Sequence, residues 1–149
     1  MQNKTDKPLL KVEGLKQYFK VNGNFVVKAV DDVSFEVYPG ETYGLVGESG
    51  SGKSVASKAI MGILAENGRI TDGSMTYTKE NGEEIDLAKL SEHEYHKIRG
   101  KEIAMVFQDP MTSLNPTMTI GKQIMEPIMK HQGCSKAEVV QDWCSAMCC

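Results

Sequence analysis

The first part of the chain alternates apolar and polar residues in the manner of antiparallel β-strands. One alternating run covers Leu9–Val21, with a break at Gly14, and the turn Asn22-Gly23-Asn24 leads into a second run, Phe25–Val37. A third run covers Arg69–Thr78. A period of two residues is typical of strands with one buried face, so the sequence predicts an antiparallel β-subdomain.

Two shorter runs have a different pattern. Tyr43–Val46 and Glu102–Phe107 are almost continuously apolar. Such runs are typical of parallel strands that are buried on both faces of a core sheet. Helical spacing follows the first of them, from Val55 to Leu64, and this helix is expected to end at Asn67-Gly68. The alternation of buried strand and helix predicts an α/β fold.

Two further helices are predicted. Ser91 and Glu94 have the spacing of a capping box, so a short helix should begin there and stop at Gly100. A longer helix should begin at Thr119 and be kinked by Pro127. Core packing is the default interpretation of its apolar face, and an adaptable groove for a partner protein is the alternative. The face consists of isoleucine and methionine residues, with two further methionines nearby in the sequence: Ile120, Ile124, Met125, Ile128 and Met129, with Met111 and Met118.

Composition narrows the class of protein. With 149 residues, 40% hydrophobic and 25% charged, the chain resembles a globular protein of one domain, or one domain and part of another. The formal net charge of −3 gives no general attraction to nucleic acid. No apolar run approaches the ~20 residues that span a bilayer, and Met1–Pro8 is too polar for an export signal. We therefore expect a cytoplasmic chain without direct membrane insertion.

One stretch carries specific chemistry, and it lies between the Tyr43–Val46 run and the following helix. It fits the phosphate-binding loop G-x-x-x-x-G-K-[ST], and its residues are Gly47, Glu48, Ser49, Gly50, Ser51, Gly52, Lys53 and Ser54. Glycines let the backbone curl closely around an anion, and the helix N-terminus adds unpaired amides. Lys53 would contact the β- and γ-phosphates, while Ser54 would offer its hydroxyl to magnesium. A glycine-rich turn without a ligand is the alternative.

Within this loop Glu48 is unusual, because a carboxylate beside phosphates is repelled, and we expect its side chain to point away. Val55, the next residue of the helix, completes the set of nucleotide-binding candidates. Gln108 follows the second buried-type strand and so should lie at the sheet edge where ligands bind. Its amide oxygen could complete a magnesium shell or orient a water, although a glutamine at a loop entrance is an equal alternative.

Metal-ligating residues give weaker signals. The cysteines lie in the last sixteen residues, at 134, 144, 148 and 149, and no C-x-x-C pair completes a ligand set. His93 and His96 are expected on a solvated polar helix face.

Two motifs together resemble a known family. The phosphate loop, followed by Phe107-Gln108-Asp109-Pro110 and Ser113-Leu114-Asn115-Pro116, is similar to the ATP-binding subunits of oligopeptide and dipeptide ABC transporters. The segment Lys28–Phe35 is similar as well, and the likeness covers about residues 9–135. It implies a P-loop NTPase core sheet with an antiparallel β-subdomain over 9–108, the beginning of a helical subdomain over 109–138, and an atypical tail at 139–149.

The resemblance also implies roles and partners. Gln108 would be the Q-loop glutamine that contacts magnesium and the attacking water, and Phe19, or Tyr18 as the fallback, would stack on the adenine of ATP. The partners would be transmembrane permease subunits and a second ATP-binding subunit, which would hold the chain on the inner face of the cell membrane. The segment after Asp109 would face the permease.

The chain also departs from the family pattern. It has no Leu-Ser-Gly-Gly-Gln-type signature motif, no later apolar strand ending in Asp-Glu and no histidine after such a strand. Trp143 and three cysteines crowd its last residues, which suggests a premature stop, a shifted reading frame or deliberate shortening near Glu138. We therefore expect binding of Mg-ATP without hydrolysis by this chain alone.

Two other classes stay open. One is a non-hydrolytic nucleotide-binding or permease-interaction module. The other is a P-loop kinase, which would need a lid of arginines, whereas Arg69 and Arg99 are the only two arginines present.

Overall fold

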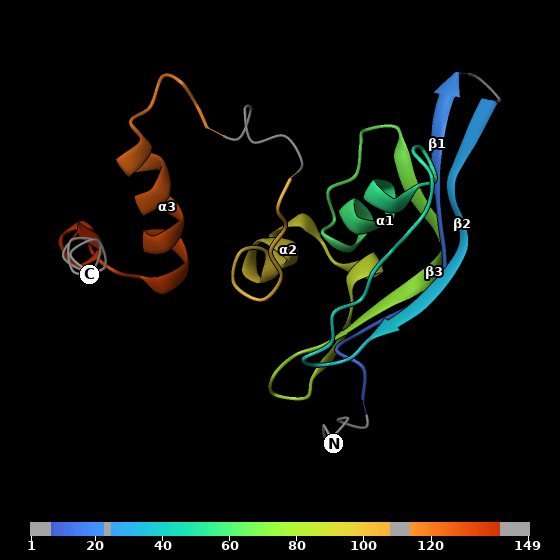
Figure 1. Ribbon diagram of the computed structural model, residues 1–149, viewed down its shortest axis with the longest axis horizontal. Helices are drawn as coiled ribbons and strands as arrows, with labels where there is room; N and C mark the ends of the chain where they lie inside the picture. The colour runs from blue at the N-terminus through green and yellow to red at the C-terminus, as the bar shows by residue number, and fades with distance from the viewer. Residues whose placement is uncertain (1–6, 23–24, 108–113, 141–149) are drawn as a thin grey trace. The chain divides into compact units, whose positions relative to one another are not determined.

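A computed structural model describes residues 7–22, 25–107 and 114–140 (Figure 1). The chain divides into two compact units, residues 1–97 and 98–149, and each is described by itself. The first unit holds the β-sheet and the phosphate loop, and the second holds a separate helix. In the described residues, no helix has both the length and the apolar character needed to cross a bilayer.

The first unit is built on one antiparallel sheet with the strand order β2-β1-β3-β4. Its strands are β1 (Leu10–Asn22), β2 (Phe25–Val37), β3 (Gly68–Thr78) and β4 (Glu84–Asp86). The three long strands confirm the runs predicted from alternation. Strands β1 and β2 are neighbours in sequence and in space, whereas β3 joins the other side of β1 after the phosphate loop and its helix (Figure 1).

The predicted break at Gly14 is an irregularity inside β1 and does not end the strand. Gly14 has a φ of +57°, and the pairing of β1 shifts register on both sides near this point. On β3, Gly73 has a φ of +93°, and a Cβ built there would lie 2.6 Å from the Gly14 carbonyl oxygen. The two glycines therefore allow the backbones of β1 and β3 to come close where the strand bulges.

The core of this unit lies between the sheet and two short helices. The helix α1 (Lys53–Ile60) contacts β1, β2 and the 3₁₀ helix η1 (Leu87–Lys89). The side chains buried here come from all of these elements: Val12, Leu15, Val30, Met75, Tyr77, Leu87, Ala56 and Ala59. Burial of these apolar side chains is the main stabilising contribution to the unit.

Helix α1 is shorter than predicted. It ends at Ile60, whereas the apolar spacing indicated continuation to Asn67-Gly68. The cause is Gly62, which takes a φ of +64° and closes a Schellman motif: its N–H donates to the Ala59 carbonyl, and the Ile63 N–H donates to the Lys58 carbonyl. Apolar residues beyond Gly62 therefore belong to the connection to β3.

Helix α2 (Glu92–Ile98) begins as predicted. The Glu94 carboxylate accepts from the Ser91 N–H at 2.8 Å, and the Ser91 hydroxyl accepts from the Glu94 N–H at 3.4 Å, which is a reciprocal capping box. Gly100, with a φ of +81°, follows its end. The Tyr95 hydroxyl donates to the Leu87 carbonyl at 2.7 Å and ties α2 to η1.

In the second unit, helix α3 (Ile120–Gln132) confirms the predicted long helix. Thr119 is its N-cap, and Gly133, with a φ of +70°, is its C-cap. Pro127 lies inside the helix without ending it, and the expected kink stays a prediction.

The two segments predicted as buried parallel strands are not strands in this structure. Tyr43–Val46 and 104–107 have no regular secondary structure, and Ile103 makes only an isolated bridge with Arg99. The Val46 and Val106 side chains are 95% and 96% exposed. A parallel strand needs a neighbouring strand to satisfy its backbone, and among the described residues neither segment pairs with one. Their apolar character was read correctly, but the pairing that would bury it is not formed.

One carboxylate in the first unit, that of Asp86, should make the stability of this unit depend on pH. Asp86 is partly desolvated, which alone would raise its pKa, but Lys89 and the N–H groups of Met75 and Ala88 outweigh this and lower the pKa from its ordinary value of 3.8. A depressed folded-state pKa adds stability above the ordinary value, and that stability is lost as pH falls through the folded pKa.

We therefore expect Asp86→Asn to lower the free energy of unfolding by about 1 to 2 kcal/mol at pH 7. The difference from the wild-type chain should shrink as the pH falls below 3.8 and through the lowered folded-state pKa of Asp86, because the carboxylate is then progressively protonated. Urea unfolding followed by circular dichroism at several pH values measures both. An equal difference at every pH would contradict the assigned role of the charge.

Candidate functional site

The phosphate loop lies between the Tyr43–Val46 segment and α1, and its lysine folds back over it. The Lys53 ammonium donates to the Gly47 carbonyl at 2.7 Å, to the Glu48 carbonyl at 2.6 Å and to the Ser51 hydroxyl at 3.1 Å. The Ser51 N–H in turn donates to the Glu48 carbonyl at 3.2 Å. A full positive charge is therefore held at the centre of a closed turn, close to where an anion would be bound.

The structure gives a different physical reason for glycine at each of three positions in the loop. Gly50 and Gly52 take φ values of +82° and +88°. Gly47 does not have a positive φ. Glycine is needed there because a Cβ would lie 2.6 Å from the Ser51 hydroxyl oxygen. Gly52 has both requirements: its Cβ would fall on the Ala29 carbonyl oxygen of β2, far inside the 3.0 Å that real Cβ contacts keep.

The first turn of α1 faces the same loop. Gly52 is the N-cap of this helix and supplies no side-chain cap, and Ser54 in the first turn is exposed. Uncapped amides and the helix dipole give the N-terminus a partial positive charge. Together with the Lys53 ammonium, they make this end of α1 suited to a multiply charged anion such as a polyphosphate.

A cavity of about 330 Å³ opens beside the loop. It is enclosed by three segments, and its lining residues are Ala29, Val30, Asp31 and Val33 of β2, Leu45, Val46 and Gly47, and Ser51, Gly52, Lys53 and Ala56. Of the predicted site residues, the structure brings Gly47, Ser51, Gly52 and Lys53 to this wall. Glu48, Ser49, Gly50, Ser54 and Val55 adjoin it in sequence. The direction of the Glu48 side chain stays a prediction.

The β2 wall of the cavity was missed by the sequence reasoning. Ala29, Val30 and Asp31 carry no motif chemistry, and the Lys28–Phe35 segment was noted only for its family resemblance. Tyr43 joins the loop to the same strand, since its ring stacks on Phe35 with centroids 5.3 Å apart.

The two aromatic candidates have different surroundings. The Tyr18 hydroxyl donates to the Asp31 carboxylate at 2.6 Å, and the Lys28 ammonium lies 5.3 Å from the Tyr18 ring centroid. The Tyr18 hydrogen bond holds the pKa of the Asp31 carboxyl below its ordinary value. Phe19 instead packs over Gly68 of β3, where a Cβ would lie 2.9 Å from its ring. Neither aromatic lines the cavity.

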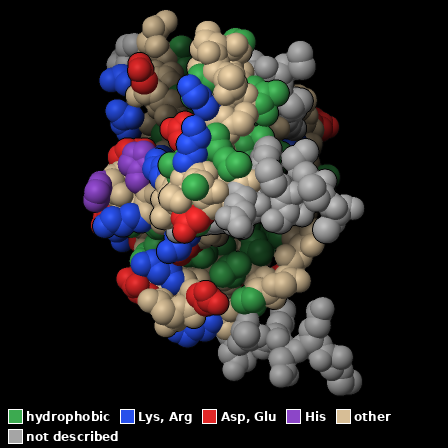
Figure 2. Space-filling model, turned by 90° about the vertical axis from the view of Figure 1, so that its left-hand side faces the viewer, with side chains coloured by type: hydrophobic (Ala, Val, Ile, Leu, Met, Phe, Trp, Pro, Cys, Tyr) green, Lys and Arg blue, Asp and Glu red, His purple; other side chains and the backbone are tan. Residues whose placement is uncertain are grey.

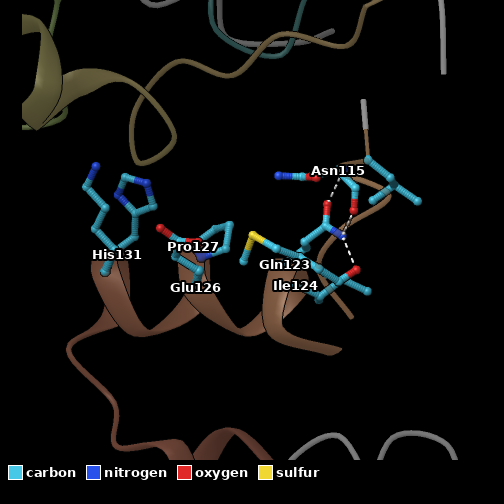
Figure 3. Close-up of a pocket in the computed structure, with 9 residues that line it drawn as sticks. Asn115, Gln123, Ile124, Glu126, Pro127 and His131 are labelled. Atoms are coloured by element: carbon cyan, nitrogen blue, oxygen red, sulfur yellow. Dashed lines mark hydrogen bonds between the residues drawn. The ribbon is translucent and has the colours of Figure 1, made fainter. Parts of the chain in front are cut away.

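Gln108 lies outside the described residues, so its placement is untested. The chain is described again from Leu114, and there a second cavity of about 560 Å³ lies within the second unit along α3 (Figure 3). The Gln123 amide organises its rim: it accepts from the Asn115 N–H at 2.7 Å and donates to the Asn115 and Met118 carbonyls at 2.9 and 3.0 Å. This network was also missed by the sequence reasoning.

The apolar face of α3 is not a closed core. Ile120 and Met129 are exposed, Ile124, Met125 and Ile128 are half-buried, and Met111 lies outside the described residues. Core packing, the default expectation, and the partner groove, its alternative, both stay predictions for this helix. Charged side chains of both signs are mixed over the face of the molecule drawn in Figure 2.

Among the described residues, the histidine and cysteine candidates for metal binding form no cluster. His93 and His96 are exposed, which confirms a solvated helix face. In the described part of the chain, no group of three or more histidine, cysteine or acidic side chains could hold a metal ion. Cys134 is half-buried, while the other three cysteines lie outside the described residues.

Comparison with known proteins identifies the family. The sequence profile described as "ABC transporter" matches residues 30–147, which is most of the chain. This chain belongs to the ABC transporter family. The match begins at Val30, which lines the cavity, and includes the whole phosphate loop.

Relatives place the chain near the peptide-importing ABC transporters. It is 53% identical over 116 residues to the dipeptide transport ATP-binding protein DppD of Lactococcus lactis. It is 51% identical over 134 residues to the oligopeptide transport ATP-binding protein OppD of Escherichia coli, a match that covers 90% of this chain and 38% of the relative. The chain thus spans about 40% of the length of the curated relatives it matches.

A solved ABC structure confirms the fold class. The ATP-binding cassette MJ0796, in a dimer bound to ADP and phosphate, superimposes with a TM-score of 0.68 at 28% identity. The match covers 87% of this ABC chain and 51% of MJ0796. The predicted P-loop fold with an antiparallel β-subdomain is therefore confirmed, although only the antiparallel sheet has paired strands among the described residues.

The contact between Gly52 and Ala29 leads to a direct test. We expect Gly52→Ala to destabilise the first unit by more than 2 kcal/mol, because a new methyl group would overlap backbone and the positive φ would be strained. Gly50→Ala is the matched control, since it has a similar φ but open space around its Cβ, and it should cost only about 1 kcal/mol. Urea unfolding measures both, and equal losses would contradict the role of the close approach.

Proposed function

We propose that this chain is the nucleotide-binding part of an ATP-binding subunit of a peptide importer, and that it binds Mg-ATP. The observation that carries the proposal is the phosphate loop geometry, with the Lys53 ammonium held over Gly47, Glu48 and Ser51 next to the uncapped start of α1. The names of the relatives, which describe dipeptide and oligopeptide transport, support the substrate class of the assembled transporter.

In this proposal the loop binds the triphosphate chain. The N–H groups of residues 48–55 surround the β-phosphate, and Lys53 exchanges its three loop acceptors for β- and γ-oxygens. That exchange is favourable because an ammonium interacts more strongly with an anionic oxygen than with a neutral carbonyl. The cavity wall at Ala29 and Val30 borders the remainder of the nucleotide.

We assign the adenine to Phe19. A stacked base needs an aromatic face that is free of other partners, and the Tyr18 ring already has the Lys28 ammonium over it and a hydroxyl bonded to Asp31. Phe19 is half-buried, and its ring packs against the backbone at Gly68.

Magnesium would be held by few protein groups. Ser54 presents an exposed hydroxyl in the first turn of α1, and Gln108 would add its amide oxygen. This fits an ion that keeps several waters and binds chiefly through nucleotide phosphates. When bound, it neutralises negative charge on the phosphate oxygens. Gln108 and Lys53 are the residues of this chain that we assign to the reaction itself.

In this proposal residues 1–149 bind Mg-ATP without completing the groups needed for hydrolysis. These residues contain no signature motif, no Asp-Glu after an apolar strand and no histidine after such a strand. In the proposed transporter a second ATP-binding subunit would complete the site, as the dimeric state of MJ0796 suggests. The half-exposed face of α3 would dock on the permease subunits and so keep the chain at the inner face of the membrane, in the cytoplasm.

Binding is tested with Lys53→Ala. We expect the wild-type chain to bind Mg-ATP and the variant to bind at least about 10-fold more weakly, because a charge-assisted contact contributes ~1.5 to 3 kcal/mol. Isothermal titration calorimetry gives both dissociation constants. Lys58→Ala, which removes a lysine from the exposed side of α1, is the matched control and should bind like the wild type. Equal affinity of all three proteins would disprove the proposed role of Lys53.

Turnover is tested separately. We expect no ATP hydrolysis above background by the purified chain, measured as phosphate release with Mg-ATP in excess. Phosphate release that disappears in Lys53→Ala would show that the chain is a complete catalyst and would contradict this part of the proposal.

A further inference from the structure

The residues of β2 that touch the phosphate loop form a short segment between two charged side chains. Ala29 presents its carbonyl to Gly52, and a methyl carbon of Val30 would lie 3.6 Å from a Cβ at Gly52. Val30 is buried, at 4% exposure. Lys28 precedes this pair, and Asp31 follows it. The loop is therefore positioned against a two-residue stretch of backbone whose flanking side chains point to their own partners.

Those flanking side chains are joined through β1. The Asp31 carboxylate accepts from the Tyr18 hydroxyl at 2.6 Å with one oxygen and from the Lys28 ammonium at 3.3 Å with the other. The Lys28 ammonium also lies 5.3 Å from the centre of the Tyr18 ring. Tyr18 and Lys28 are direct partners in the pairing of β1 with β2. One aromatic residue of β1 thus contacts both ends of the segment.

The backbone pairing is irregular at this point, so side-chain contacts contribute more to fixing the position of the segment. The pairing of β1 with β2 shifts register between Gln17 and Tyr18. Asp32, next to Asp31, has a φ of +62°, the one positive value of a non-glycine residue in the described chain. In the sheet of described strands β2 is an edge strand, so its backbone is paired on the β1 side only. Ladder hydrogen bonds alone hold such a stretch weakly.

We propose that Tyr18, Lys28 and Asp31 form a clamp that positions the phosphate loop by fixing the Ala29-Val30 backbone under Gly52. The proposal rests on the nucleotide-binding function and adds to it that Tyr18 is a positioning residue, acting through β2, and does not stack on the base. Because the Gly52 contact is between backbone groups, a small displacement of Ala29 moves the N-cap of α1 directly.

The clamp is tested with Tyr18→Phe, which removes one hydroxyl and leaves the ring and all charges in place. We expect the dissociation constant for Mg-ATP to rise about 3- to 10-fold, which is less than the full loss of one hydrogen bond to a charged group, because the Tyr18 hydroxyl acts on the loop only through β2. The matched control is Tyr38→Phe, which removes a similar bond to a carboxylate, from Tyr38 to Glu36 at 2.8 Å, at the other end of β2. The control should bind like the wild type.

A second measurement does not depend on the nucleotide. Amide hydrogen exchange, followed by mass spectrometry of the free protein, should be faster in Tyr18→Phe over residues 47–56, the loop and the start of α1. It should be unchanged there in Tyr38→Phe. Thermal unfolding of both variants should show similar, small losses, so that any difference at the loop is local.

The outcomes separate the two proposals. Faster exchange over 47–56 in Tyr18→Phe alone supports the clamp, and weaker Mg-ATP binding by the same variant supports it further. Exchange at the wild-type rate, or equal effects of the two variants, overturns it. If the wild-type chain does not bind Mg-ATP at all, the proposed function fails, and the exchange measurement still decides the clamp.

Discussion

The phosphate loop depends on one close contact between two backbones. The Ala29 carbonyl of β2 occupies the place where any side chain at position 52 would begin. Gly52 must also take a φ of +88° to turn the chain into α1. A position that excludes a Cβ and requires a positive φ can hold only glycine without strain. The start of α1 is therefore fixed against β2 at this contact.

The antiparallel half of the fold could be predicted from the sequence because its signals are local. Alternation located β1, β2 and β3 within a residue or two, and Ser91 with Glu94 located the start of α2. The end of α1 could not be found from its apolar stripe, since Ile63 and Leu64 continue the spacing after Gly62 has already terminated the helix. A single glycine with a positive φ outweighed the pattern there.

The prediction of the two buried parallel strands was wrong for a different reason. A continuous apolar run such as Tyr43–Val46 reports that a segment prefers to be buried, but pairing is a property of two segments. The loop residues were predictable because a motif fixes their spacing. The β2 wall at Ala29–Asp31 and the Gln123 network carry no motif, and only the three-dimensional arrangement shows that they border the two cavities.

The order of the strands has a consequence for how the site forms during folding. Strands β1 and β2 are only two residues apart in the sequence and can pair within microseconds, whereas β3 must close a loop that contains the phosphate loop and all of α1 before it reaches β1. The loop-closing step carries the entropic cost of ordering about 30 residues. We therefore expect the anion-binding turn to become ordered late in folding, after the first hairpin and together with the docking of β3.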